Sequence, residues 1–201
     1  MSMATSQVFL RRVGHGVMLV FGGVDMTTIG TAGLAEQTAR GEDAAAKSVV
    51  EGFGSVRPVP NAEERPDPRL RYRVVFNITK AASSPDKTNP SLDKIARFLN
   101  LLGSDGVRPA RGDVVAIIHG PATPLILNDG AYAARMKVAG NPNTPLVAAL
   151  RQAGVSIRVC GQAMVAHDIA PEQVAPGIAV DVSALTTLAN LQLRGYALIP
   201  D

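Results

Sequence analysis

The chain contains one cysteine, Cys160, and Gly161 and Gln162 follow it directly. The apolar stretch 155–160 predicts a strand, and a short helix is expected from Gly161 to about His167. A thiol at this junction would meet the free backbone N–H groups of the helix N-terminus, which stabilise a reactive thiolate. Gly161 would let backbone donors or a substrate approach closely, and Gln162 could contact a ligand. Cysteine is also common in protein cores, so an inert, buried Cys160 is the alternative.

His119 and Gly120 end a nearly continuous apolar run that begins at Asp113. Such a run is typical of a central parallel strand that is covered on both faces. His119 could polarise or protonate a sulfur atom across the crevice, or it could hydrogen-bond a loop carbonyl and shape the following turn. We therefore take Cys160 as the candidate catalytic residue. The candidate substrate-binding residues are His119, Gly120, Gly161 and Gln162.

Several other chemistries are excluded by what the sequence lacks. One cysteine excludes an internal disulfide framework and a multi-cysteine metal site. The three histidines, His15, His119 and His167, are too widely separated to indicate a zinc site. Neither a glycine-rich nucleotide loop nor the G-x-S-x-G elbow of hydrolases is found. We expect no metal and no cofactor.

Charge and composition argue against nucleic acid as a partner. The net charge is +3 and the pI about 9.3, but the arginines are scattered and form no basic run. Aromatic residues make up only 4% of the chain and tryptophan is absent, so bases would find few side chains to stack on. Hydrophobic residues at 46% are sufficient for a core of aliphatic side chains.

Strand and helix signals alternate from Tyr72 to Ile199. Strands are expected at 72–79, 113–120, 155–160, 177–182 and 196–199, and helices at 92–102, 129–138, 144–153, 161–167 and 183–194. This alternation predicts an α/β fold with an open, mostly parallel sheet and helices on both faces. Ligands of such sheets bind beyond the carboxyl ends of the strands. The loop after Thr79, His119-Gly120 and Cys160-Gly161-Gln162 should share that edge. In the last helix, we expect Leu185, Leu188 and Ala189 to face inward.

The chain divides into three parts. Residues 1–35 resemble a signal peptide or an N-terminal tail, because Arg11 and Arg12 precede an apolar run and a small-residue exit. That run is too short and too polar to cross a bilayer, so no integral membrane span is expected. Residues 36–70 form a Pro-rich linker or strap, with four prolines between Pro58 and Pro68. Residues 71–201 form the α/β domain, which a non-globular segment therefore precedes.

The stretch Val155-Ser156-Ile157-Arg158-Val159-Cys160-Gly161-Gln162, preceded by Leu150-Arg151-Gln152-Ala153-Gly154, resembles the DsrE/DsrF-like family, which has the YchN-like fold. The 114–121 strand with its His-Gly-Pro ending and the Gly-Tyr-Ala of 195–197 fit the same pattern. The likeness covers about residues 71–199. It implies a homo-oligomeric sulfur carrier or sulfurtransferase-like protein in which Cys160 bears a persulfide and exchanges sulfur with donor and acceptor proteins. Members with a Pro-rich lead are often exported, which implies a periplasmic location, with the cytoplasm as the alternative.

A second interpretation remains open beside the sulfur carrier. The chain could be a non-catalytic oligomeric protein that binds a small ligand or serves as an accessory subunit, with an inert Cys160. The reactivity of Cys160 in the native protein separates the two interpretations.

Overall fold

The structure is a computed structural model that describes residues 48–201. The expected signal peptide or tail (1–35) and the first part of the predicted linker lie outside the described residues.

A five-stranded sheet forms the centre of the fold. Its strands, in the spatial order β4-β3-β2-β1-β5, are β1 (Val74–Ile78), β2 (Val114–Ile118), β3 (Ser156–Cys160), β4 (Ala179–Asp181) and β5 (Ala197–Ile199). Every neighbouring pair is parallel. The predicted α/β class with a parallel sheet is therefore confirmed.

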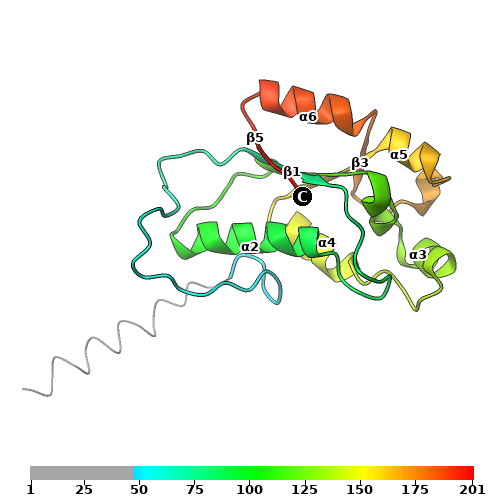
Figure 1. The fold of residues 1–201 in the computed structure, drawn as a ribbon, viewed down its shortest axis with the longest axis horizontal. Helices are drawn as coiled ribbons and strands as arrows, with labels where there is room; N and C mark the ends of the chain where they lie inside the picture. The colour runs from blue at the N-terminus through cyan, green and yellow to red at the C-terminus, as the bar shows by residue number, and fades with distance from the viewer. Residues whose placement is uncertain (1–47) are drawn as a thin grey trace, which may run out of the picture. The chain divides into compact units, whose positions relative to one another are not determined.

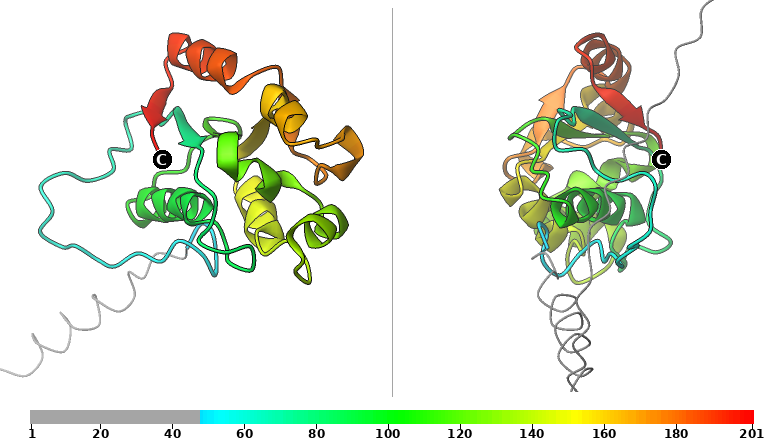
Figure 2. Two further views of the ribbon diagram at one scale, coloured as in Figure 1. Left: turned by 45° about the vertical axis from the view of Figure 1, so that its right-hand side comes forward. Right: turned by 90° about the vertical axis from the view of Figure 1, so that its left-hand side faces the viewer.

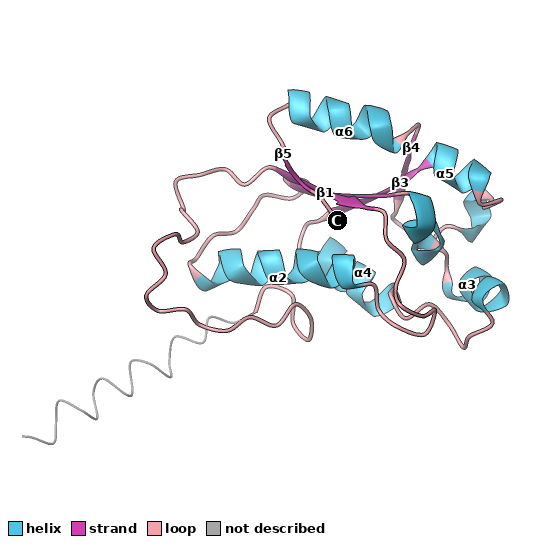
Figure 3. Cartoon of the chain, viewed as in Figure 1, coloured by secondary structure: helices cyan, strands magenta, loops and turns pink. Residues whose placement is uncertain are grey.

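Helices cover both faces of this sheet, as Figures 1 and 3 show. One face carries α2 (Pro90–Ser104) and α4 (Thr144–Gln152), and the other carries α6 (Ala184–Leu193) (Figure 2). The short α5 (Gly161–Ala166) follows β3 and contacts both cores, through Met164 and Ala163. The other helices of residues 48–201 are α3 (Asp129–Met136) and two 3-10 segments, η1 (Gly120–Ile126) and η2 (Pro171–Gln173). Within residues 48–201, no helix has the length and apolar character that a bilayer crossing requires.

The larger core lies between the sheet and the α2–α4 layer. Alternate residues of β1, including Phe76 and Ile78, pack here against Leu92, Ile95 and Leu99 of α2. The side chain of Asn89 starts α2 by accepting a hydrogen bond from the backbone N–H of Ser91 at 2.9 Å. All five residues of β2 are buried, as its unbroken apolar sequence predicts for a central strand.

The opposite face of the sheet has a thinner cover. Val75, Val115, Ile117 and Cys160 pack there with Ala184 and Leu191 of α6. The expectation that Leu185 and Ala189 face inward is wrong: Leu185 is 80% exposed and Ala189 is exposed as well. Leucines occur around more than one side of this helix, and only the side with Ala184, Leu188 and Leu191 meets the sheet.

Residues 48–70 run along α2 and form an ordered strap. The buried side chain of Asn100, on α2, fixes its start. The Asn100 Oδ1 accepts from the Val50 N–H at 2.8 Å, and its Nδ2 donates to the carbonyls of Val50, Phe53 and Gly54. Gly54 has φ +59° and lies so close to the backbone of α2 that a Cβ would stand 2.1 Å from the Arg97 nitrogen. Hydrogen bonding and close approach together hold this part of the chain on the helix.

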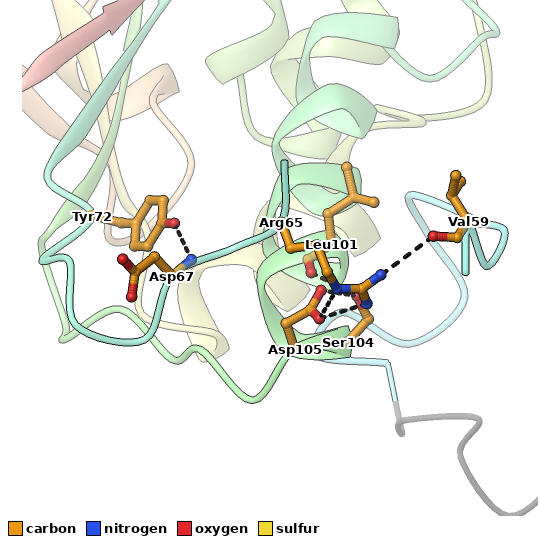
Figure 4. Close-up of polar contacts among 7 residues, drawn as sticks. All are labelled: Val59, Arg65, Asp67, Tyr72, Leu101, Ser104 and Asp105. Atoms are coloured by element: carbon orange, nitrogen blue, oxygen red, sulfur yellow. Dashed lines mark hydrogen bonds and ion pairs between the residues drawn. The ribbon is translucent and has the colours of Figure 1, made fainter. Parts of the chain in front are cut away.

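The Pro-rich part of the strap is attached by Arg65, as Figure 4 shows. Its Nε and Nη2 donate to Asp105 at the end of α2, at 2.9 and 2.6 Å, and its Nη1 donates to the Val59 carbonyl at 3.3 Å. The Tyr72 hydroxyl accepts a hydrogen bond from the Asp67 N–H at 2.8 Å. The strap thus reaches β1 along the side of α2.

Candidate functional site

The carboxyl ends of β2 and β3 lie side by side at one edge of the sheet. After β2 the chain runs through η1 and α3 to α4, whereas after β3 it enters α5, whose Met164 packs in the larger core and whose Ala163 packs against the smaller one (Figure 1). In open parallel sheets, ligands bind beyond the carboxyl ends of the strands. The predicted site residues at 119–120 and 160–162 lie at these two strand ends.

Strand register makes His119 and Cys160 neighbours. The last paired residues of β2 and β3 are Ile118 and Val159, and His119 and Cys160 follow them directly in the sequence. Adjacent strands lie about 4.8 Å apart. Side chains alternate along a strand, so His119 shares the thinly covered face with Ile117, and Cys160 also belongs to that face. The structure therefore brings these two candidate residues together.

His119 is half-buried and fixed by a side chain on β1. Its Nε2 lies 2.7 Å from the Oδ1 of Asn77, and its backbone N–H donates to the Ile78 carbonyl at 3.0 Å. Since Oδ1 only accepts, Nε2 carries the proton and Nδ1 is left as an acceptor. Burial lowers the pKa of His119, and the nearby charge of Asp201 opposes this with a smaller effect. The imidazole is thus held neutral at neutral pH, in one tautomer.

Cys160 is 5% exposed and packs in the small core with Ile117 and Ala184. It occupies the N-cap position of α5, and its side chain makes no capping hydrogen bond. The thiol thus lies at the predicted strand end, beneath a cover of apolar side chains. A molecule can reach the Cys160 sulfur only if these apolar side chains move aside.

The other predicted site residues have mixed surroundings. At Gly161, a Cβ would stand 2.9 Å from the Asp181 carbonyl oxygen. The missing side chain therefore makes room for the backbone of β4. Gly120 has φ +56°, which the turn from β2 into η1 requires. Gln162 is exposed in the first turn of α5.

Two residues of this edge were not predicted from the sequence. One is Asn77, whose only signal was a polar type within the apolar strand of Val74–Ile78. The other is Asp201, whose carboxylate accepts from the Thr79 N–H at 2.8 Å, the Lys80 N–H at 2.6 Å and the Ser91 hydroxyl. Burial acts to raise the pKa of Asp201, but its hydrogen bonds from Ser91, Lys80 and Thr79 outweigh this and lower it.

The loop after Thr79, the third predicted position, borders a cavity of about 180 Å³. This cavity lies between residues 81–85 and the η1 segment, and the buried amides of Asn89 and Asn143 reach its wall. The Asn143 Oδ1 accepts from the Asn89 N–H at 2.7 Å, so the loop is firmly closed onto the start of α4. Neither His119 nor Cys160 lines the cavity, so the structure separates this loop from the thiol.

Within residues 48–201, no three histidine, cysteine, aspartate or glutamate side chains are grouped in a way that could hold a metal ion. At the ends of β2 and β3, the structure places one thiol near one neutral imidazole.

Comparison with known proteins places these observations in a family. No curated protein matches the chain. A solved structure of a protein of unknown function, MTH1491 from Methanobacterium thermoautotrophicum, is similar with 21% identity over 65% of this chain and 99% of its own, and the TM-score is 0.49. The family model of the DsrE/DsrF-like family matches residues 72–200. This range includes all five strands of the sheet but not the preceding strap. On this match, the chain belongs to the DsrE/DsrF-like family.

Proposed function

We propose that this protein is a sulfur carrier of the DsrE-like type, with Cys160 as the thiol that bears a persulfide. The observation that carries the proposal is the position of Cys160 at the carboxyl end of β3, next to His119 in the strand register, in a member of this family. The relationship to sulfur relay supports a carrier, with a sulfur donor and an acceptor protein as partners.

The proposed transfer is an exchange between sulfur atoms. The Cys160 thiolate attacks the outer sulfur of a donor persulfide, the donor S–S bond breaks, and a new S–S bond forms on Cys160 while the donor leaves as a thiolate. The sulfane sulfur moves without net oxidation or reduction. The reverse attack by an acceptor thiolate on the outer sulfur of Cys160 passes it on. The neutral His119 offers its Nδ1 as the acceptor for the Cys160 proton.

Access to Cys160 depends on the thin layer above it. The small core has only Ala184 and Leu191 of α6 fully buried against the sheet, with Leu188 half-buried. Segments with few buried apolar contacts open at lower free energy than the main core. In this proposal, α5 and the start of α6 move apart to admit the donor.

The test is the reactivity of Cys160 in the folded protein. A sulfane donor such as a small-molecule persulfide should add one sulfur atom to the native protein, seen by mass spectrometry, and alkylation with iodoacetamide should block the gain. Cys160→Ala is the matched control and should gain nothing. If the thiol reacts only after unfolding, the carrier function is wrong.

The burial of Cys160 favours one other function, a non-catalytic oligomeric protein with an inert cysteine. At 5% exposure among aliphatic side chains, the thiol resembles an ordinary core residue. The cavity of about 180 Å³ beside Asn89 and Asn143 would then be the small-ligand site. For this function, Cys160→Ala preserves ligand binding, whereas Asn143→Leu in the cavity wall abolishes it.

We also propose that the protein is a homo-oligomer. Leu185, Ala189 and Leu193 form an exposed stripe on the outer side of α6, and Leu193 is 86% exposed. Contiguous exposed apolar side chains mark interaction surfaces. Leu185→Glu with Leu193→Glu should reduce the mass measured by light scattering to that of a monomer. Val59→Glu, a change at an exposed apolar residue of the strap, should leave it unchanged.

A periplasmic location is proposed from the sequence of residues 1–35 and the Pro-rich lead alone. The intact mass of the protein recovered from its natural host tests it. Loss of an N-terminal segment ending near residue 35 is expected, and retention of Met1–Ala35 favours the cytoplasm.

A further inference from the structure

The charged residues at the amino edge of the sheet, opposite the edge with Cys160, are strongly biased in sign. The segments that lead into the strands there are 65–73, 105–113, 151–155, 174–178 and 194–196. They contain eight arginines and three aspartates, with no lysine and no glutamate. This surplus of five positive charges exceeds the net charge of the whole chain, which is +3. Charge is thus concentrated at one edge, although the sequence shows no basic run.

Hydrogen bonds place these arginines in the order of the strands. Arg151 Nη1 donates to the Pro176 carbonyl near β4, at 2.9 Å, and Arg111 Nη1 donates to the Arg151 carbonyl near β3, at 3.3 Å. At the other end, Arg73 Nη1 donates to the Arg194 carbonyl near β5, at 3.2 Å. The arginines therefore form an arc along the edge. We call this arc the arginine rim; its members are Arg69, Arg71, Arg73, Arg108, Arg111, Arg151 and Arg194.

The three aspartates of these segments leave most of the rim charge uncompensated. Asp113 is buried and binds Arg71 through two hydrogen bonds of 2.9 Å. Asp67 binds Arg69, and Asp105 binds Arg65, outside the rim. Within the described residues, the side chains of Arg108 and Arg194 have no hydrogen-bond or ion-pair partner, and both are exposed. Parts of the rim lie on the left of Figure 1, where the strap, the α2–β2 loop and the α6–β5 turn approach one another.

From this arrangement we propose that the arginine rim is a docking surface for an acidic segment of a partner protein. Guanidinium groups bind carboxylates in a planar, two-pronged geometry, and arginines fixed by backbone hydrogen bonds lose little freedom on binding. Five strands at about 4.8 Å spacing give the rim a length of roughly 20 Å, enough for several acidic residues of an extended chain. The exposed Leu70, between Arg69 and Arg71, adds an apolar contact of the kind that protein interfaces contain.

Nucleic acid fits this rim less well than an acidic protein. Bases need aromatic faces for stacking, but Tyr72 packs against Phe98 and Tyr196 lies under Arg73. The partner is therefore one whose carboxylates supply the binding charge. Its docking leaves the Cys160 edge free, and the inference is independent of any sulfur chemistry.

The test uses the full chain and a fluorescein-labelled octaglutamate peptide, with binding measured by fluorescence anisotropy. Reversal of three exposed rim charges, by Arg108→Glu, Arg111→Glu and Arg194→Glu, should raise the Kd by at least about tenfold. The matched control, Lys80→Glu, Lys87→Glu and Lys94→Glu, changes the net charge equally but lies away from the rim, and it should have little effect. Cys160→Ala should bind the peptide as the natural chain does, so a failure of the sulfur proposal stays distinguishable.

Two results would overturn the inference. One is an equal loss of affinity in the rim and control variants, which would mean that net charge alone attracts the peptide. The other is tighter binding of duplex DNA or phosphatidylglycerol vesicles than of octaglutamate at the same ionic strength. If charge reversal prevents folding, as judged by circular dichroism, the variant Arg108→Gln, Arg111→Gln and Arg194→Gln replaces it, and an unchanged Kd in that variant counts equally against the rim.

Discussion

Asn77 and His119 face each other across the β1–β2 pair, with the imidazole Nε2–H donating to the amide Oδ1 at 2.7 Å. The contact lies at the carboxyl edge of the two strands, on the face that also holds Cys160. The hydrogen bond from Nε2 to Asn77 therefore keeps the proton on Nε2 and leaves Nδ1 of the neutral imidazole as an acceptor.

The pKa of His119 should lie below the value of about 6.5 that is usual for histidine. Burial disfavours the charged form, so protonation is easier in the unfolded chain, and stability should fall as the pH drops below about 6.5. NMR titration of the imidazole resonances measures the pKa directly. Because the charge of Asp201 opposes the shift, Asp201→Asn should lower the pKa of His119 further. A value at or above the usual one would contradict the assignment.

Asp201→Asn should also destabilise the fold by roughly 1–3 kcal/mol, because the carboxylate accepts hydrogen bonds from Thr79, Lys80 and Ser91. The lowered pKa of Asp201 means that this contribution is present above the usual value of about 3.9 and is lost as the pH falls through the lower folded-state value. Urea denaturation at neutral and acid pH tests both statements. Asp168→Asn, at an exposed aspartate with positive φ, is the control and should change little.

Removal of the Asn100 side chain should release the strap. Asn100→Leu abolishes its bonds to Val50, Phe53 and Gly54 and leaves those buried groups unpaired, so a loss of about 2–4 kcal/mol is expected. Trypsin should then cut the strap faster than in the natural chain. Equal cleavage rates for the two proteins would show that Asn100 does not hold the strap. Asn190→Leu, at an exposed position of α6, serves for comparison.

Two glycines should respond to alanine in opposite directions. Gly161→Ala places a Cβ at 2.9 Å from the Asp181 carbonyl, which should cost about 1–3 kcal/mol and disturb the β3–β4 pair. Gly130→Ala, inside α3, meets nothing closer than 3.7 Å and should gain about 0.5–1 kcal/mol from reduced chain entropy. Thermal unfolding of the two variants gives the comparison, and a stabilised Gly161→Ala would rule out the tight packing.

The central strands were predictable because a parallel strand buried on both faces leaves an unbroken apolar run, such as Val114–Ile118. The exposed three-residue edge strands β4 and β5 were predictable from their place in the alternation of strands and helices. That His119 and Cys160 lie close together could be predicted, because each lies at the end of a strand of a parallel sheet, and the carboxyl ends of such strands share one edge. The residues that act on His119 could not be predicted from the sequence. Asn77 lies on β1 and Asp201 lies beyond β5, and they come near His119 only because these strands pair in the folded sheet. The inward side of α6 was misjudged because a helix with leucines on several sides gives no single apolar face.

Pairing of β5 with β1 has a consequence for synthesis of the chain. Within residues 48–201, the edge of β1 that faces away from β2 pairs only with Ala197–Ile199, although β1 is the first strand of this range to leave the ribosome. An unpaired edge of valine and phenylalanine is a template for association with other nascent chains. Shortening the chain by its last few residues would leave that edge permanently open, and aggregation during expression is the expected result.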